Sequence, residues 1–462
     1  MVSILLHTLG CKLNQLESEA FADTFGQAGF VLHDASAKTP PSIVIINTCT
    51  VTSKADQKAR RVIRKALRDY PNSAVIVTGC YARLDKSEIE KLENGKNKRL
   101  FVLKGKEKLL DLPAFFTEGD DVCEVVRRWY EEGGENFSHG GREDIEPKVR
   151  ENTEEFYERA FQFAPEKFSD HTRSFLKIQD GCDNHCTYCR IRLARGHSVS
   201  LSAERVLERL KILEQNHAEA VLTGVNICQY HDKMSGNNLT GLLEYLLAGT
   251  QKISLRLSSL EPEYIDENFA KVISHERIRP HFHLSIQSCS KKILEKMGRS
   301  YNGRTIEKAV SLLRSVKDDP FIACDIITGF PGETQTEFNE TYELCKKTGF
   351  AWMHVFPYSK RPGTPAFSFT GAVQEKEVTK RVQLLTDLAW QGRADYIRRW
   401  LGRDVEVLTE KSDGRFCRGI SENYLKLLVQ YKGKKPPPGA VLRCKLAKKG
   451  DNKGDFDAVA HF

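Results

Sequence analysis

Three closely spaced cysteines are the residues of this chain best suited to do chemistry. Cys182, Cys186 and Cys189 form a CxxxCxxC run directly after the apolar, strand-like stretch 175–179. Three thiolates on one tight loop can hold three corners of a four-iron cluster and leave the fourth iron open for another ligand. The spacing therefore predicts an iron-sulfur centre with an open coordination position, which indicates catalysis rather than electron storage.

A zinc site is the alternative for these cysteines, with His185 or His197 as the fourth ligand. Zinc sites usually combine one CxxC pair with a second CxxC or an HxxxH pair, and the sequence has no such second pair near the run. The spacing therefore favours the cluster over zinc.

A second set of cysteines follows three short apolar runs near the start of the chain. Cys11 follows the run 3–7, Cys49 follows 43–46, and Cys80 follows 74–77. Residues 1 to about 110 read as alternating strands and helices, and ligands bind at the carboxyl ends of parallel strands. The three thiols are thus predicted to converge on a second cluster site. The alternative is three small residues buried at loop mouths, where free cysteine is common.

The central part of the chain contains six strand-like runs separated by helical stretches, which predicts a partial or full β/α barrel. The runs are 175–179, 220–223, 253–257, 281–285, 321–327 and 352–356. The active site of such a barrel lies at the carboxyl ends of its strands, where the CxxxCxxC loop also falls. Polar or small residues at the other strand ends are candidates for holding a polar cofactor: Gly224, Asn226, Ser258, Gln287 and Gly329, with Ser259, Glu261, Ser288 and Glu333 beside them.

Length and composition limit the class of protein. A chain of 462 residues suggests two or three domains. No run approaches the apolar length of a membrane span, and the start lacks the features of a signal peptide, so a cytoplasmic protein without membrane contact is expected. Thirteen cysteines, an odd number, fit reduced thiols and metal binding better than disulfides.

The charge is unevenly distributed. The whole chain has a net charge of +8. The segment 118–160 contributes −8, so the remaining residues together carry +16. That remainder suits a polyanionic partner, whereas the acidic segment is predicted to be an exposed linker or an inserted helix, with Cys123 as an incidental residue.

The last part of the chain changes to short β-like runs separated by turn residues, which predicts a small all-β barrel of about 60 residues. The runs are 405–408, 424–429, 440–446 and 458–460. Residues 401–462 carry a net charge of +5. A basic β-barrel attached to an enzyme favours RNA binding, and the alternative is a solvated surface whose lysines serve solubility.

Together these motifs resemble the methylthiotransferases, a family of radical S-adenosylmethionine enzymes. The resemblance rests on the CxxxCxxC run and on three further motifs: Thr8-Leu-Gly-Cys-Lys-Leu-Asn-Gln15, Asn47-Thr-Cys-Thr-Val-Thr52 and Gly79-Cys-Tyr81. Tyr188, just before the third cysteine of the run, also fits the family and is a cofactor-binding candidate. The resemblance implies an N-terminal cluster domain (1–115), an acidic linker (116–167), a radical S-adenosylmethionine core (168–398) and a C-terminal TRAM RNA-binding barrel (399–462).

The same resemblance implies two [4Fe-4S] clusters. Cys182, Cys186 and Cys189 would bind the cluster that cleaves S-adenosylmethionine, and Cys11, Cys49 and Cys80 would bind an auxiliary cluster that supplies sulfur. Sulfur and a methyl group would be added at C2 of an adenosine at position 37 of the transfer RNA anticodon loop, and an electron donor would be required. The basic stretch 54–68 could contact phosphates there, or could be an ordinary solvated helix face.

Two motifs resemble the branch that acts on threonylcarbamoyladenosine: Leu9-Gly-Cys-Lys-Leu-Asn14 and Leu222-Thr-Gly-Val-Asn-Ile227. Alternatives with the same machinery are isopentenyladenosine in transfer RNA or a ribosomal-protein side chain as substrate. An alternative of another class is an RNA-binding iron-sulfur redox sensor without catalysis. Arg192 stands where the family commonly has proline, which leaves the conformation of the loop after Cys189 open.

Overall fold

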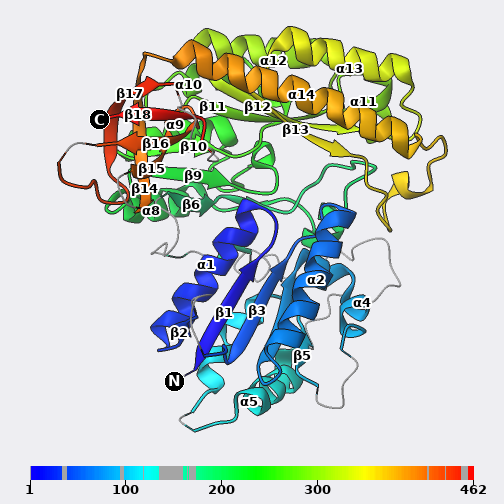
Figure 1. Ribbon diagram of the computed structural model, residues 1–462, viewed down its shortest axis with the longest axis vertical. Coiled ribbons are helices and arrows are strands. Elements are labelled where there is room, and N and C mark those ends of the chain that lie inside the picture. Colours follow the sequence, from blue (N-terminus) through cyan, green and yellow to red (C-terminus); the bar gives the residue numbers. More distant parts are fainter. Residues whose placement is uncertain are drawn as a thin grey trace. The chain divides into compact units, whose positions relative to one another are not determined.

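The computed structural model describes residues 2–33, 39–93, 98–117, 119–134, 160–163, 165, 173–413, 416–431, 433–448 and 456–462 (Figure 1). The chain forms two compact units. The first comprises residues 1–169 together with 180–183 and 189–199, and the second comprises 170–179, 184–188 and 200–462. The CxxxCxxC loop therefore contributes Cys182 and Cys189 to the first unit and Cys186 to the second.

The first unit is built on a parallel five-stranded sheet with the order β2-β1-β3-β4-β5. Its strands are β1 (Ser3–Thr8), β2 (Val31–Leu32), β3 (Ile43–Thr48), β4 (Ala74–Gly79) and β5 (Leu100–Val102). Alternate residues of β3 enter different cores: Ile43 and Ile45 pack on one face, and Val44 and Ile46 on the other. Both faces are covered, which explains why the strand is a continuous apolar run rather than an alternating one.

Helices cover both faces of this sheet. Helix α1 (Lys12–Gln27) buries Phe21 and Phe25 in one core, and α2 (Ser53–Asp69) buries Ala59 and Ile63 in the other. Short helices complete the unit in this order: α3 (Cys80–Leu84), α4 (Lys86–Glu90), η1 (Glu107–Leu110), η2 (Leu112–Phe115), α5 (Val122–Trp129), η3 (Tyr130–Gly134) and α7 (Ile191–Arg195).

The acidic segment, expected to be an exposed linker or an inserted helix, is partly structured and contains α5. Helix α5 buries Val126 and Trp129 in the same core as Phe21, and Phe163 packs edge-on against Phe21 with ring centroids 5.6 Å apart. Cys123 is partly buried and its thiol donates to the carbonyl oxygen of Asn72 at 3.6 Å. Residues 135–159 and 166–172 lie outside the described part of the chain.

The second unit contains the predicted β/α barrel in a partial form, which we call the half-barrel. Strands β6 (Ser174–Lys177), β9 (Glu219–Thr223) and β10 (Ser254–Leu257) form one parallel sheet, and β11 (His281–Gln287), β12 (Phe321–Thr328) and β13 (Trp352–Pro357) form another. Parallel bridges from Leu255 to Ile278 and from Leu260 to Leu284 join the two sheets. The strands thus lie side by side in chain order, as in a β/α barrel that is not closed. The short strands β7 (Gln179–Asp180) and β8 (Val199–Ser200) pair with each other in a separate sheet.

Helices connect these strands, and α12, α13 and α14 lie along one side of β12 and β13 (Figure 1). The helical elements are α8 (Ala203–Glu214), η4 (Ile227–Gln229), α9 (Leu239–Gly249), η5 (Pro262–Tyr264), α10 (Glu267–Ile273), α11 (Lys291–Met297), α12 (Gly303–Val316), α13 (Gln335–Thr348), η6 (Pro365–Ser368) and α14 (Glu375–Trp400).

The chain then forms a closed five-stranded barrel with the order β14-β15-β16-β18-β17. Its strands are β14 (Asp404–Asp413), β15 (Phe416–Ser421), β16 (Lys426–Gln430), β17 (Val441–Ala447) and β18 (Ala458–His461). The predicted small barrel is confirmed and is consistent with the TRAM type. The sequence analysis missed β15, in which Gly419 interrupts the apolar pattern. A side chain at that position would press on Val407 of the neighbouring strand, which accounts for the glycine.

None of the helices in the described ranges is long and apolar enough to cross a membrane.

Candidate active site

Cys49 and Cys80 follow β3 and β4 directly, and Cys11 lies three residues after the end of β1, at the same edge of the parallel sheet of the first unit. Two glycines shape the loops. Gly10 has φ +104°, and a Cβ there would lie 2.7 Å from Sγ of Cys49. Gly79 has φ +94°, and a Cβ there would lie 2.6 Å from the backbone nitrogen of Thr48. Only glycine allows this close approach, so Gly10 and Gly79 let the three cysteine-bearing loops pack against one another.

Asn14 joins two of these loops through hydrogen bonds. Its fully buried amide nitrogen donates to the carbonyl oxygens of Leu9 (2.8 Å) and Thr48 (3.0 Å). The Thr48 hydroxyl donates to the carbonyl oxygen of Thr78 at 2.5 Å and accepts from the backbone of Ala82 at 3.3 Å, which ties in the loop of Cys80. One hydrogen-bonded chain therefore fixes all three cysteine-bearing loops.

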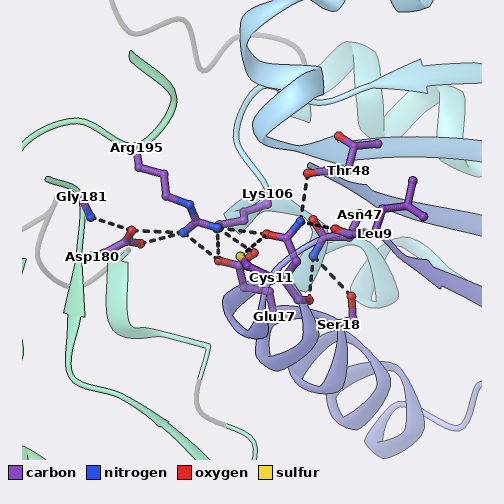
Figure 2. A network of polar contacts seen from close by, with 11 residues as sticks. Leu9, Cys11, Glu17, Ser18, Asn47, Thr48, Lys106, Asp180, Gly181 and Arg195 are labelled. Atoms are coloured by element: carbon purple, nitrogen blue, oxygen red, sulfur yellow. Dashed lines mark hydrogen bonds and ion pairs between the residues drawn. The ribbon is translucent and has the colours of Figure 1, made fainter. Parts of the chain in front are cut away.

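A buried charge network borders Cys11 (Figure 2). Arg195 donates from Nη1 to Asp180 at 3.1 Å and from both terminal nitrogens to Oε1 of Glu17 at 3.2 Å. Lys106 also pairs with Glu17, whose side chain is fully buried. Two cations thus compensate two carboxylates, which is the condition under which buried charges persist.

The network reaches the cysteine through Asn14. Its Oδ1 accepts from Nη2 of Arg195 at 3.2 Å and from the Cys11 thiol at 3.7 Å. Desolvation of the thiol raises the pKa of Cys11, although the residue as a whole is exposed, and the positive charge of Arg195 opposes that rise. Burial also raises the pKa of Cys49, to about 12, with the neighbouring thiols of Cys11 and Cys80 adding to the rise. The three thiols lie close enough to influence one another's charge.

The CxxxCxxC loop is also held by backbone contacts in the first unit. Gly181 has φ +70°, and a Cβ there would collide with the backbone of His197. The backbone of Cys182 donates to the carbonyl oxygen of Gly196 at 3.1 Å, and the backbone N–H of Ile191 donates to Sγ of Cys189 at 3.4 Å. An N–H group directed at sulfur stabilises a thiolate, so Cys189 is prepared for metal binding.

The segment after Cys189 forms the short helix α7 although it lacks the proline common in the family. Arg192 lies within this helix, and its carbonyl oxygen accepts from the backbone of Gly196 at 2.9 Å. Arg190 anchors the start of the helix through a two-point ion pair with Asp85, at 2.9 and 3.2 Å. Hydrogen bonds and this ion pair thus fix the backbone in place of a proline ring.

In the second unit, Glu261 gathers polar side chains at the mouth of the half-barrel. It accepts from Asn184 (2.7 Å) and Asn226 (2.9 Å), and it pairs with Arg299. Arg299 also donates to the hydroxyl of Tyr188 at 3.1 Å. Burial raises the pKa of Cys186, and Arg299 opposes that rise. Tyr188 and Asn226 are therefore brought together, through two residues that follow β10 and α11.

The other predicted cofactor-binding residues occupy separate places around the strand ends. Gly224 approaches Gln179 so closely that a Cβ would lie 2.8 Å from its Oε1, and the backbone of Ser258 donates to Leu222 at 3.0 Å. Gln287 is buried with φ +58°. Gly329 donates to Glu333 at 2.6 Å. Their role in cofactor binding stays a prediction.

The donor sets fit iron-sulfur clusters better than single ions. Among the residues that the structure describes, no group of three or more His, Cys, Asp or Glu side chains is arranged to hold one metal ion. A four-iron cluster separates its thiolates more widely, because each binds a different iron. His197, the zinc-ligand alternative, instead pairs through Nδ1 with Asp183 at 2.8 Å. Three thiols on glycine-shaped loops match the requirement of a cluster.

Sequence reasoning missed the residues that position these thiols. Arg195 is separated from Glu17 by 178 positions, and no local pattern links them. Arg299 likewise meets Glu261 across 38 positions. Asn14 carried a usable signal, because an amide three residues after Cys11 at the start of a helix can reach back to the preceding loop.

Six exposed basic residues line helix α2, which the sequence analysis singled out: Lys54, Lys58, Arg61, Arg64, Lys65 and Arg68. Arg60 differs from them, because it turns inward and donates to the hydroxyl of Tyr81 at 2.7 Å. The exposed face is a candidate surface for RNA phosphates.

Two protein-family models match parts of this chain. Residues 3–100 match the family described as "Uncharacterized protein family UPF0004", and residues 176–345 match the radical SAM superfamily. The structure is similar to the radical S-adenosylmethionine methyltransferase TsrM from Kitasatospora setae, with a TM-score of 0.50 and 15% identity over 79% of this chain and 73% of that one. At that identity the likeness concerns the fold.

Curated relatives match over nearly the whole chain. The threonylcarbamoyladenosine tRNA methylthiotransferase MtaB of Treponema pallidum is 38% identical, over 97% of this chain and 99% of that protein. The protein of the same name from Bacillus subtilis is 32% identical, over 99% of this chain and 97% of its own length. That from Thermotoga maritima is 33% identical, over 93% and 91%.

Proposed function

Because the chain belongs to the threonylcarbamoyladenosine tRNA methylthiotransferase family, we propose that it adds a methylthio group to C2 of N6-threonylcarbamoyladenosine at position 37 of transfer RNA. The product is the 2-methylthio derivative of that nucleoside. An adenosine in a single-stranded anticodon loop is accessible without opening a duplex, which suits an enzyme that must reach a base carbon.

The observation that carries the proposal is the presence of two separate cysteine trios, each on loops shaped by glycine. Cleavage of S-adenosylmethionine needs one cluster with an open iron, which Cys182, Cys186 and Cys189 would hold. Cys11, Cys49 and Cys80 would hold the second. When bound, the two [4Fe-4S] clusters and S-adenosylmethionine supply the reducing electron, the sulfur atom and the methyl group, while an external reductant renews the electron.

The side chains around these thiols bind and orient the reactants. Arg299 and Glu261 present a cation and a carboxylate beside Cys186, a combination that suits the amino-acid end of S-adenosylmethionine. Tyr188 is fixed by Arg299, and Asn226 is fixed by Glu261. In the first unit, Asn14 and Thr48 hold the cysteine loops in place before any cluster binds. Such preorganisation keeps the reacting atoms in position during the reaction.

Mass spectrometry of transfer RNA nucleosides tests the proposal. A host that lacks its own methylthiotransferases would be compared with and without this gene. Appearance of 2-methylthio-N6-threonylcarbamoyladenosine is the expected result. Appearance of the isopentenyl counterpart alone would overturn the substrate but keep the reaction. An unchanged nucleoside profile, from protein shown to contain its iron, would overturn the proposal and direct attention to a protein substrate or to redox sensing.

A further inference from the structure

A strip of aromatic rings lies along β13, the last strand of the half-barrel. Successive side chains of a strand point to opposite faces, so Trp352, His354 and Phe356 share one face. Met353, on the other face, is buried, whereas His354 is exposed and 40% of Phe356 is accessible. Accessible rings in a row on a strand are unusual, because such apolar surface is normally covered.

The rings of this strip contact one another in sequence. The centroids of Trp352 and His354 lie 6.0 Å apart, and those of His354 and Phe356 lie 6.4 Å apart with an interplanar angle of only 22°. His283 of β11 adds a fourth ring, 5.4 Å from that of His354. We call these four residues the aromatic strip. The accessible parts of His354 and Phe356 offer ring surface to a flat ligand.

Hydrogen bonds hold the two imidazoles of the strip. His283 lies between Ser259 (Nδ1 to Oγ, 2.9 Å) and Asp325 (Nε2 to Oδ1, 3.1 Å). The indole N–H of Trp352 donates to Nδ1 of His354 at 3.2 Å. Because that indole can only donate, Nδ1 of His354 is the acceptor, and a neutral His354 carries its proton on Nε2. The rings are therefore fixed before a ligand arrives.

The strip adjoins the mouth of the half-barrel within the same unit. Ser259 lies two residues before Glu261, and Phe356 lies two residues before Tyr358. Tyr358 and Tyr188 pack against the same small apolar cluster, around Phe330 and Met297. The hydroxyl of Tyr358 donates to the carbonyl oxygen of Ala366, whose backbone donates to Thr187 of the CxxxCxxC loop. A ligand on the strip is thus placed next to the cysteine loop.

We propose that the aromatic strip binds the unpaired adenine ring of the target nucleotide, by stacking on Phe356 and His354. The inference rests on the proposed function and names the residues that receive its substrate. Proteins bind splayed-out RNA bases by stacking them on aromatic and histidine rings. Lys360, exposed four residues after Phe356, supplies a cation for the adjoining phosphate.

Substitutions that remove or retain a ring test this proposal in the full-length, iron-loaded protein. His354→Leu and Phe356→Leu remove a ring, whereas His354→Phe and Phe356→Tyr retain one. Tyr245→Leu is the matched control, because Tyr245 is also 40% accessible but lies on the outer helix α9. The probe is an anticodon stem-loop that carries N6-threonylcarbamoyladenosine, and its affinity is measured by fluorescence anisotropy.

We expect each ring-removing substitution to weaken stem-loop binding roughly tenfold or more, which is the typical effect of losing one base-aromatic stack. The ring-retaining variants and the control should bind within about twofold of the unaltered protein. Cleavage of S-adenosylmethionine in the absence of RNA should be unchanged in all five. Unchanged RNA affinity of both leucine variants would overturn the proposal, as would equal losses in the leucine and ring-retaining variants.

A loss of RNA-independent cleavage in the leucine variants, with RNA affinity unchanged, would also overturn it, because the rings would then serve the cofactor. Failure of the proposed function is distinguishable. In that case the unaltered protein forms no methylthio product, while the affinity comparison still decides whether the strip binds the base.

Discussion

Arg195 and Glu17 form a buried ion pair in which both terminal guanidinium nitrogens lie 3.2 Å from the same carboxylate oxygen. The pair joins the helix after the CxxxCxxC loop to the helix that begins at Cys11, and both segments belong to the first unit. Neither side chain exposes more than 6% of its surface to water, so the ion pair contributes to the free energy of unfolding with little screening by solvent. Breaking it by removing one partner would leave an uncompensated charge in the interior.

Replacement of Arg195 by glutamine should therefore destabilise the protein by about 3–5 kcal/mol, the usual cost of breaking a buried pair. The free energy of unfolding, from urea denaturation, measures the effect. Arg61→Gln on the exposed face of α2 is the control and should change stability by less than about 0.5 kcal/mol. A loss for Arg195→Gln as small as that of the control would contradict the compensating role of Arg195.

Glu219 makes stability depend on pH. Burial alone would raise its pKa, but ion pairs with Arg256 (2.7 Å) and Arg279 (3.0 Å) outweigh burial and lower the pKa to about 2. A lowered pKa contributes stability that is complete above the unfolded value of 4.5 and is lost as the pH falls from there through 2. The shift corresponds to roughly 3 kcal/mol.

Glu219→Gln should therefore be less stable than the unaltered protein at pH 7, and the difference between the two should shrink as the pH falls from 5 towards 2. Denaturant titrations at several pH values measure it. Glu244→Gln, on the exposed side of α9, provides the comparison. A difference that stayed constant over this pH range would show that the Glu219 carboxylate is not held ionised by the two arginines.

Gly79 should not tolerate alanine. The new Cβ would occupy a left-handed backbone at φ +94° and would collide with the backbone of Thr48, so the loops of Cys49 and Cys80 would separate. We expect a stability loss of about 2 kcal/mol or more, together with a reduced iron content per chain. Gly26→Ala in α1 is the control, because nothing lies within 4 Å of its Cβ. Normal iron content in Gly79→Ala would contradict the role of this loop.

Substitutions in the two cysteine trios should affect different parts of the reaction. Cys182→Ala should abolish both S-adenosylmethionine cleavage and methylthiolation, whereas Cys11→Ala should spare cleavage and stop sulfur insertion. Iron content, formation of 5′-deoxyadenosine and nucleoside analysis report the three properties. Cys123→Ala, outside both trios, should behave like the unaltered protein. Full methylthiolation by Cys11→Ala would refute the assignment of an auxiliary cluster.

The exposed basic face of α2 should bind phosphates. Replacing Arg61, Arg64 and Lys65 by glutamine should weaken transfer RNA binding and reduce the dependence of log affinity on log salt by up to about 3, since each neutralised phosphate adds about 0.9 to that slope. The control is a triple replacement of the exposed lysines Lys291, Lys308 and Lys347 by glutamine. An equal change of slope in both variants would argue against a specific site on α2.

The fold was predictable where burial dictates the local pattern. Apolar runs such as 43–46 and 74–77 became the greater part of β3 and β4, because strands covered on both faces are nearly continuous apolar runs. The six runs of the half-barrel were recognisable for the same reason. Strand β15 was missed, because Arg418 and Gly419 interrupt its apolar character. Helix α5 lies in the segment expected to be an exposed linker or an inserted helix. The burial of its Val126 and Trp129 in the core was not predictable, because the segment is acidic overall.

The candidate site was predictable only in part. Spacing identified the cysteines, since thiols must sit close together along the chain or at the ends of neighbouring strands. It could not identify Arg195 or Arg299, whose partners are distant in sequence and are chosen by the packing of whole elements. A basic residue in a sequence carries no mark of whether it will reach solvent, as Lys58 does, or be buried in an ion pair, as Arg195 is.

The strand order of the C-terminal barrel bears on biosynthesis. Strand β18 comes last in the chain but lies between β16 and β17, so a nascent chain that stops before Ala458 leaves one edge of each neighbour unpaired. The interior of the barrel is continuous with Phe321 and Trp400, at the base of the half-barrel. That shared interior stays open to water until β18 emerges from the ribosome. The small barrel and the half-barrel would therefore complete their folding late and together. A premature stop near the C-terminus would expose the half-barrel as well to chaperones and proteases.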